Sequence, residues 1–198
     1  MPGPATNPDT SRSSTYISDG FYRELIANFS DWQDDARAVG DVAERDAFRA
    51  FLEQEARLLD QLRYEQWLNM FTAECIYWVP STPHAGDPRR EVAIMFDDRR
   101  RLEDRVFRLR TGFAWSQAPA SRTVRLITNV EVFTTERDAV RMLRSNFLIS
   151  EFWGAEVRVL TGWAGHRVIR DREAWKIQAK QVNLIDCDQS IRNPSIIL

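Results

Sequence analysis

Three side chains in the sequence are of the kinds that enzymes use to move protons: Asp60, Tyr64 and His166. Asp60 and Tyr64 are four residues apart, a spacing that puts two side chains on the same face of a helix. Together they could serve as a base and a hydrogen-bond donor in one cavity, with His166 as a further proton carrier. The sequence therefore allows a stand-alone dehydratase or isomerase that uses these residues. The competing interpretation is that Asp60 caps the end of a helix and that His166 is a polar residue on a strand.

Residues that could hold a metal or a cofactor are few and scattered. The only cysteines are Cys75 and Cys187, and the only histidines are His84 and His166. No CxxC, CxH or HxxxH spacing occurs, whereas Rieske clusters and structural zinc sites need closely paired ligands. There is also no GxSxG nucleophile turn, no phosphate-binding glycine loop and no dinucleotide fingerprint. We therefore expect no metal, no cofactor and no catalytic residue in this chain.

The overall composition excludes several classes of partner. The 198 residues include 27 basic and 29 acidic side chains, a balance that argues against nucleic-acid binding. No apolar run approaches the roughly 20 residues that span a bilayer. The N-terminal residues lack the apolar stretch of a secretory signal. We expect a cytoplasmic protein with neither nucleic acid nor membrane as a partner.

The chain is expected to begin with an arm and a short helix. Its first 17 or so residues are rich in Pro, Ser, Thr and Asn, a composition typical of flexible segments. Ser18 and Asp19 could then cap a short helix. We divide the chain into this arm with its short helix, residues 1–41, and a single domain, residues 42–198.

A longer helix and a strand should position Asp60 and Tyr64. Asp41 and Glu44 have the spacing of a capping box, and apolar residues recur at helical spacing after them, with Glu55 as a polar exception. The helix should break near Asp60. A shorter helix then carries Tyr64, and the run "CIYWVP" that follows predicts a strand.

A second amphipathic helix is predicted to start at Asp97 or Asp98. One of its faces is apolar, and the other carries six arginines between positions 99 and 110. Such a face is usually only solvated, but arginine also suits protein interfaces because its planar head pairs bidentately and stacks. The hypothesis is a docking surface for a partner protein. It comprises Trp78, Arg99, Arg100, Arg101 and Arg105.

The remainder of the chain alternates between apolar and polar residues, as strands do. In the last run Trp175, Ile177, Ala179 and Gln181 alternate with Lys176, Gln178 and Lys180. Short polar turns separate the runs, as hairpins require. Helices followed by an antiparallel meander predict an α+β fold in which the sheet can curl around the N-terminal helices.

Several stretches resemble one known family, in that family's order. They are "EARLLDQLRYEQWLNMFTAECIYWVP", "MFDDRRRLEDRVFRLRTG", "SRTVRLITNVEV", "LRSNFLI" and the ending "NPSIIL". The chain resembles the small (β) subunit of aromatic-ring-hydroxylating dioxygenases, which are Rieske non-haem iron oxygenases. The resemblance extends from about residue 55 to the end of the sequence and is weak before residue 42.

This resemblance implies a fold, a partner and a role. The fold would be a cone-shaped barrel of the nuclear-transport-factor-like and cystatin-like kind. The partner would be a large (α) subunit that carries both the Rieske 2Fe–2S cluster and the mononuclear iron, in an α3β3 assembly with the small subunits as a trimer. Electrons would reach it through a reductase or ferredoxin. The small subunit would be a non-catalytic structural component acting in bacterial aromatic catabolism, and the ending "CDQSIRNPSIIL" resembles members that act on benzoate-like acids.

Overall fold

The structure is a computed structural model that describes residues 17–83, 86–88, 90–114, 117–191, 193 and 195–198, so His84 lies outside the described residues. Within these residues the elements follow one another along the chain in this order: α1 (Asp19–Asn28), the 3-10 helix η2 (Asp35–Arg37), α2 (Val42–Asp60), α3 (Tyr64–Leu68), β1 (Phe71–Pro80), β2 (Ala93–Asp98), α4 (Arg99–Thr111), β3 (Arg122–Thr134), β4 (Val140–Trp153), β5 (Glu156–Asp171) and β6 (Ala174–Leu184).

Polar side chains fix where three of the helices begin. Ser18, Asp41 and Asp98 each accept a hydrogen bond from the backbone N–H three residues later, at 3.1, 2.7 and 2.9 Å. Each bond satisfies a donor that the first turn of a helix leaves free. The predicted starts of α1, α2 and α4 are therefore confirmed.

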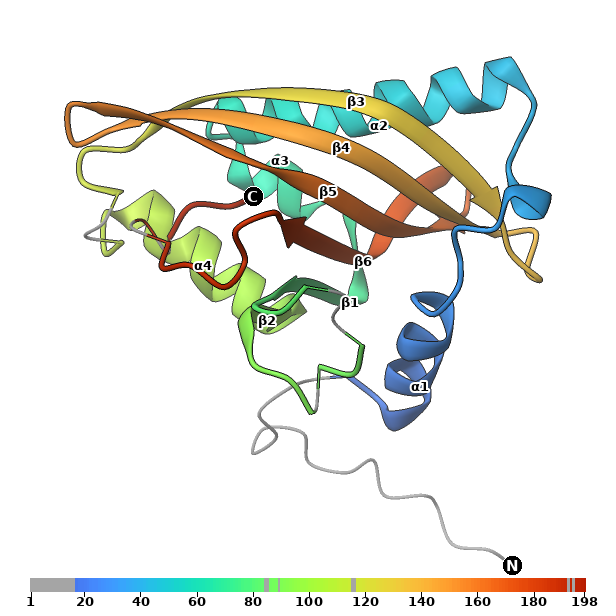
Figure 1. Cartoon of the computed structure of the whole chain (residues 1–198). Coiled ribbons are helices and arrows are strands. Elements are labelled where there is room, and N and C mark those ends of the chain that lie inside the picture. The colour runs from blue at the N-terminus through green and yellow to red at the C-terminus, as the bar shows by residue number, and fades with distance from the viewer. Residues whose placement is uncertain (1–16, 84–85, 89, 115–116, 192, 194) are drawn as a thin grey trace, which may run out of the picture.

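The strands form one strongly curled sheet (Figure 1) with the order β2-β1-β6-β5-β4-β3. Neighbouring strands are antiparallel except for β1 and β6, which run parallel. The curl brings β2 and β3, at the two ends of this order, toward the same side of the molecule. Because β2 and β3 do not pair with each other, the sheet is an open cone and not a closed barrel.

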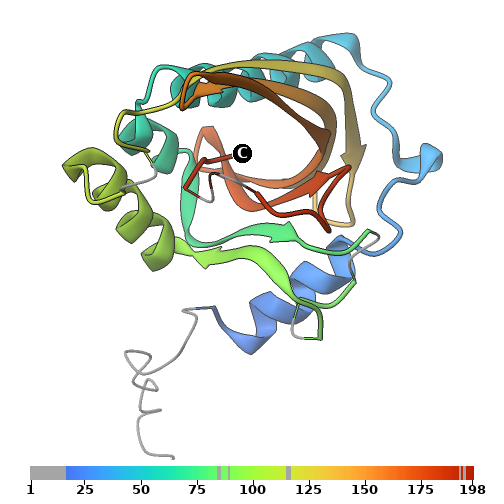
Figure 2. The same cartoon turned by 60° about the vertical axis from the view of Figure 1, so that its left-hand side comes forward.

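Three helices bridge the open side of the cone. α2 lies against β3, α4 lies against β1 and β2, and α3 contacts both of these helices. Figure 2 looks into the curve of the sheet and shows the end of the chain lying inside it. The main hydrophobic core fills this interior with side chains from α2, α3, the sheet and residues 196–198.

The N-terminal segment packs on the outer face of the same sheet. Phe21 and Leu25 of α1 form a second buried cluster with Ile76, Trp78 and Ala179. The chain after α1 continues over β5, where a Cβ atom at Gly165 would lie only 3.0 Å from the rings of Phe29 and Trp32. Glycine at this position lets the segment approach the strand closely.

The predicted α+β fold with a curled sheet is confirmed, and two details differ from the prediction. The sheet contains one parallel pair, β1 with β6, two strands that are far apart in the sequence and are not joined by a hairpin. The strand β2 was not predicted, since its last residues, Asp97 and Asp98, resemble only the cap of the following helix. The division at residue 41 stays a prediction.

Candidate functional site

The charged part of the interior is built around Glu55, which α2 turns toward the sheet. The buried side chains of α2 recur at helical spacing, and Glu55 is among them with only 4% of its surface exposed. A carboxylate in such a place is tolerated only when it is paired and hydrogen-bonded.

Glu55 has three such partners. Its Oε1 accepts hydrogen bonds from Lys180 Nζ at 2.9 Å and from Trp67 Nε1 at 3.1 Å. Its Oε2 lies 3.0 Å from Nε2 of His166. His166 and Lys180 are directly paired residues of β5 and β6, so the antiparallel register presents both to the same point on α2.

The protonation states of this trio follow from burial and from each other. Burial alone would raise the pKa of Glu55, but the positive charge of Lys180 and the hydrogen bonds from Lys180 and His166 outweigh it and hold that pKa well below its usual range. Burial lowers the pKa of His166, and the Glu55 carboxylate offsets only part of that effect. A neutral His166 must donate from Nε2 to the carboxylate, which leaves its Nδ1 as an acceptor.

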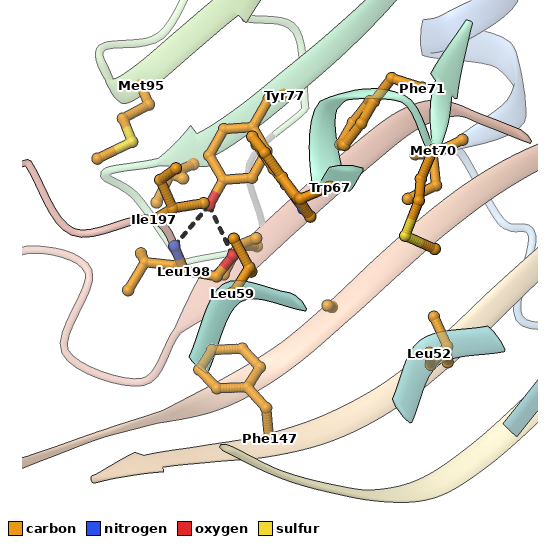
Figure 3. Close-up of a cluster of buried hydrophobic side chains, with 14 of the residues drawn as sticks. Leu52, Leu59, Trp67, Met70, Phe71, Tyr77, Met95, Phe147, Ile197 and Leu198 are labelled. Carbon is orange, nitrogen blue, oxygen red and sulfur yellow. Dashed lines mark hydrogen bonds between the residues drawn. The ribbon is translucent and has the colours of Figure 1, made fainter. Parts of the chain in front are cut away.

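The last residues of the sequence belong to the core of the cone, and Figure 3 shows Ile197 and Leu198 beside Tyr77. Ile196, Ile197 and Leu198 are each 3% exposed. The Tyr77 hydroxyl donates to the carbonyl oxygen of Leu198 at 2.8 Å and accepts from its N–H at 2.9 Å. Lys180 Nζ also donates to this oxygen, at 3.0 Å. The side chain of Lys180 therefore joins Glu55 to the end of the chain.

Asp60 is bound to β3 and does not cap α2. Its carboxylate accepts from Thr123 Oγ1 at 2.7 Å and from the backbone N–H of Arg125 at 2.9 Å, and it forms an ion pair with the Arg125 guanidinium. Gln61 occupies the C-terminal cap of α2. The expected capping role of Asp60 is therefore wrong, because a helix C-terminus offers carbonyl acceptors that a carboxylate cannot bind.

A small cavity lies beside these groups. Its lining includes Glu55, Arg125, His166, Lys180 and Leu198, but neither Asp60 nor Tyr64. Its volume is about 20 Å³, enough for about one water molecule and far below the roughly 300 Å³ of a small-molecule pocket. His166 Nδ1 has no hydrogen-bond partner among the described residues and could accept one from such a water. The structure thus does not bring Asp60, Tyr64 and His166 together around one cavity.

The arginines of α4 divide into two groups. Arg99 donates to the carbonyl oxygens of Leu68 and Phe71, and Arg105 pairs with the buried Asp97 at 2.5 Å. Both therefore hold α4 to the rest of the protein. Arg101 lies on the exposed side of the helix and donates to a backbone carbonyl.

The remaining residues of the predicted docking surface lie in different surroundings. Arg100 is half-buried near the start of α4. Trp78 is 2% exposed beneath α1. A partner could reach the side chain of Trp78 only if α1 moved. Trp78 is therefore not part of the surface that α4 presents.

Metal-binding side chains are not gathered in the part of the chain that the structure describes. No group of three or more His, Cys, Asp or Glu residues there could hold a metal ion. Cys75 and Cys187 are buried free thiols, and burial raises the pKa of Cys75 to about 12, which keeps it protonated and unreactive. None of the described helices is long and apolar enough to cross a membrane.

The sequence interpretation missed the Glu55 network for an identifiable reason. Glu55 was visible as a polar residue on an apolar helix face. Simple alternation along the last strand, however, put Lys180 on the face opposite to Ile177 and Ala179. In the structure the β5–β6 register shifts at Gln178. This bulge reverses the alternation, so Ile177 and Lys180 both face the interior while Ala179 packs beneath α1.

Comparison with known proteins gives consistent matches. Residues 54–189 match the family model described as "Ring hydroxylating beta subunit". The small subunit of 2-halobenzoate 1,2-dioxygenase from Burkholderia cepacia is 42% identical over 94 residues, which are 44% of this chain and 57% of that protein. The β subunit of toluate 1,2-dioxygenase from Pseudomonas putida is 35% identical over 107 residues, or 52% of this chain and 65% of that protein. The chain thus spans less than two thirds of the length of these curated relatives.

A solved structure extends the likeness. The β subunit of a benzoate 1,2-dioxygenase from Burkholderia mallei superimposes with a TM-score of 0.62 at 28% identity. That match covers 79% of this chain and 97% of the other.

Proposed function

The chain belongs to the family of ring-hydroxylating β subunits, as its sequence predicted, and we propose that it is the non-catalytic structural small subunit of an aromatic-ring-hydroxylating dioxygenase in bacterial aromatic catabolism. The dioxygenase would be an oxidoreductase, and the chemistry would belong to its other subunit. The named substrates of the relatives, 2-halobenzoate and toluate, favour a benzoate-like aromatic acid as the substrate of the whole enzyme.

One observation carries the non-catalytic part of this proposal: the charged groups that line the interior are bound to other groups of the protein. Glu55 is held by Lys180 and His166, and Arg125 is held by Asp60. A general acid or base needs a free site for its proton within reach of a substrate. The one nitrogen of His166 that stays without a partner among the described residues, Nδ1, adjoins a cavity of only about 20 Å³, which has no room for an aromatic substrate and favours a structural role.

The proposed partner is a large subunit that carries the Rieske 2Fe–2S cluster and the mononuclear iron. A Rieske centre and a facial-triad iron together require four histidines, and this chain has two. We further propose self-association as a trimer in an α3β3 assembly, electron supply through a reductase or ferredoxin, and a cytoplasmic location. The contact with the large subunit would involve α4, the helix whose arginines the sequence singled out.

The experiment compares the chain alone with the chain co-expressed beside its large subunit. We expect the purified chain alone to contain no stoichiometric iron and to leave aromatic acids unchanged in the presence of O₂ and a reductase. The co-expressed pair should copurify, contain iron and hydroxylate the ring. Stoichiometric iron together with ring hydroxylation by the isolated chain would overturn the proposal.

A further inference from the structure

The helix α4 carries many more arginines than carboxylates. Between residues 99 and 111 there are six arginines and two carboxylates, a net charge of +4 in a chain whose total is −2. Two of the arginines, Arg99 and Arg105, are used internally, as described above. Any positive charge that is available to a partner protein must therefore come from arginines on the solvent-exposed side of α4.

Arg101 and Arg108 are the arginines that stay available there. Both are exposed, and neither forms an ion pair within the described part of the chain. Their hydrogen bonds go to backbone carbonyl oxygens, from Arg101 to Phe96 at 3.1 Å and from Arg108 to Asp104 at 3.4 Å. A carbonyl dipole does not neutralise a guanidinium, so each retains its full charge toward solvent.

Large apolar side chains accompany these charges. Phe107 is 50% exposed, and Phe113, just beyond the helix, is 63% exposed. Phe107 lines a shallow groove together with Arg101, Arg108 and the acids Asp97 and Asp104. Asp97 is already neutralised by Arg105, so two free arginines face a single other carboxylate in this groove.

A neighbouring arginine, Arg110, contacts the exposed Phe107 ring. The guanidinium of Arg110 lies 5.8 Å from the centre of the Phe107 ring, within cation–π range, and 3.6 Å from Glu65 of α3. The Phe107 ring is therefore exposed at the surface and in contact with the guanidinium of Arg110. Aromatic residues and arginine are both enriched in protein interfaces, and arginine is also enriched among the residues that dominate binding energy.

We propose that this surface, defined by Arg101, Phe107, Arg108 and Phe113, is the docking site for an acidic segment of the large subunit that also presents an apolar side chain. The carboxylates of the segment pair with Arg101 and Arg108, and its apolar side chain covers Phe107. Charge complementarity selects an acidic occupant, because Arg101 and Arg108 face outward without a carboxylate partner among the described residues. The inference rests on the proposed function, keeps Arg101 of the four arginines suggested by the sequence, and adds Phe107, Arg108 and Phe113.

The test measures the affinity of the purified large subunit for variants of this chain. We expect Arg101→Glu and Arg108→Glu each to raise the Kd by about tenfold or more, and the double variant by about a hundredfold or more. Phe107→Ala should raise it by about tenfold. Higher salt should weaken wild-type binding more than binding of the double variant, because exposed charge pairs are screened.

Matched variants control for charge and for apolar surface. Arg23→Glu changes the charge of an exposed arginine on α1 by the same amount, and Ile185→Ala removes an exposed apolar side chain beyond β6. Both should bind like the wild type. Circular dichroism checks that every variant keeps its fold.

The outcomes separate the two proposals. If the wild type binds and the α4 variants bind equally well, this docking site is wrong and the proposed function stands. If the wild type does not bind the large subunit at all, the proposed function fails and the docking site fails with it.

Discussion

The interior of the cone and the exposed side of α4 both carry charged side chains, but they satisfy those charges in opposite ways. Inside, His166 and Lys180 both bind the carboxylate of Glu55, at 3.0 and 2.9 Å. On α4, Arg101 and Arg108 have no carboxylate partner among the described residues. The contrast separates buried charges that are paired within the fold from charges on α4 that have no carboxylate partner among the described residues, and the predictions below test whether the first group serves stability and the second serves association.

The largest expected effect comes from removing the centre of the interior network. Glu55→Gln leaves the buried ammonium of Lys180 without its counter-charge, and breaking a buried pair in this way typically costs about 3–5 kcal/mol. We expect urea denaturation to show a loss of that size. The matched control is Glu53→Gln on the exposed face of the same helix, where Arg49 pairs at 2.8 Å; its loss should be within about 0.5 kcal/mol. Equal losses for the two variants would erase the distinction between the regions.

A second prediction sharpens the comparison within α4 itself. Arg105→Gln removes the partner of Asp97, whose carboxylate receives two hydrogen bonds from that guanidinium, at 3.0 and 2.5 Å. Because Arg105 is only half-buried, water can reach the freed carboxylate, and we expect a loss of about 1–3 kcal/mol, below that of the fully buried pair. Arg101→Gln, four residues earlier, should change the free energy of unfolding by no more than about 0.5 kcal/mol. A large loss for Arg101→Gln would show that this arginine is structural too.

The pH dependence of stability tests the protonation state of His166. Its pKa in the folded chain is lowered by burial, so below about pH 6.5 the unfolded chain binds a proton that the folded chain does not. Stability should therefore fall as the pH drops below that value, by at most about 1.4 kcal/mol per pH unit for one proton. The depressed pKa of Glu55 acts in the same direction below about pH 4.3. His166→Gln should abolish the first of these two slopes, and a slope that persists in this variant would contradict the assignment.

The smallest effect on stability is expected on the exposed side of α4. Phe107→Ala and Arg108→Gln should each change the free energy of unfolding by less than about 0.5 kcal/mol, because neither side chain is buried. Thermal and urea denaturation of the variants measure this directly. Retained stability with weakened large-subunit binding is the signature of a docking surface, whereas a marked loss of stability would place these residues with the structural group.

The sequence predicted most of the fold because its signals were local. The caps at Ser18, Asp41 and Asp98 and the apolar periodicity of α2 and α4 depend on residues a few positions apart. The order of the elements allowed a curled sheet, and the family resemblance added its cone shape. The short strand β2 and the parallel pairing of β1 with β6 depend on distant partners, and neither leaves a local pattern.

The interior network was harder to predict for the same reason. Glu55 of α2 lies more than 100 residues before its two partners on the sheet, His166 and Lys180. In addition, a bulge at Gln178 determines which face of the sheet Lys180 occupies. The proposed docking surface on α4 starts from a sequence signal but also needs the structure. Helical periodicity found the charged face of α4, but only the contacts of Arg99 and Arg105 with the rest of the fold show which arginines are already in use.

The most direct test of the account is the turnover of the assembled enzyme built with variants of this chain. Tyr64→Phe and His166→Gln remove the proton-carrying groups that a catalytic role would require. Complexes that contain either variant should hydroxylate the aromatic substrate at a rate per assembled complex within about twofold of the wild type, because general acid–base groups that contribute to catalysis are worth about 10²–10⁴-fold. A loss of about a hundredfold or more in complexes that remain fully assembled would show that this subunit takes part in the chemistry and would contradict the account.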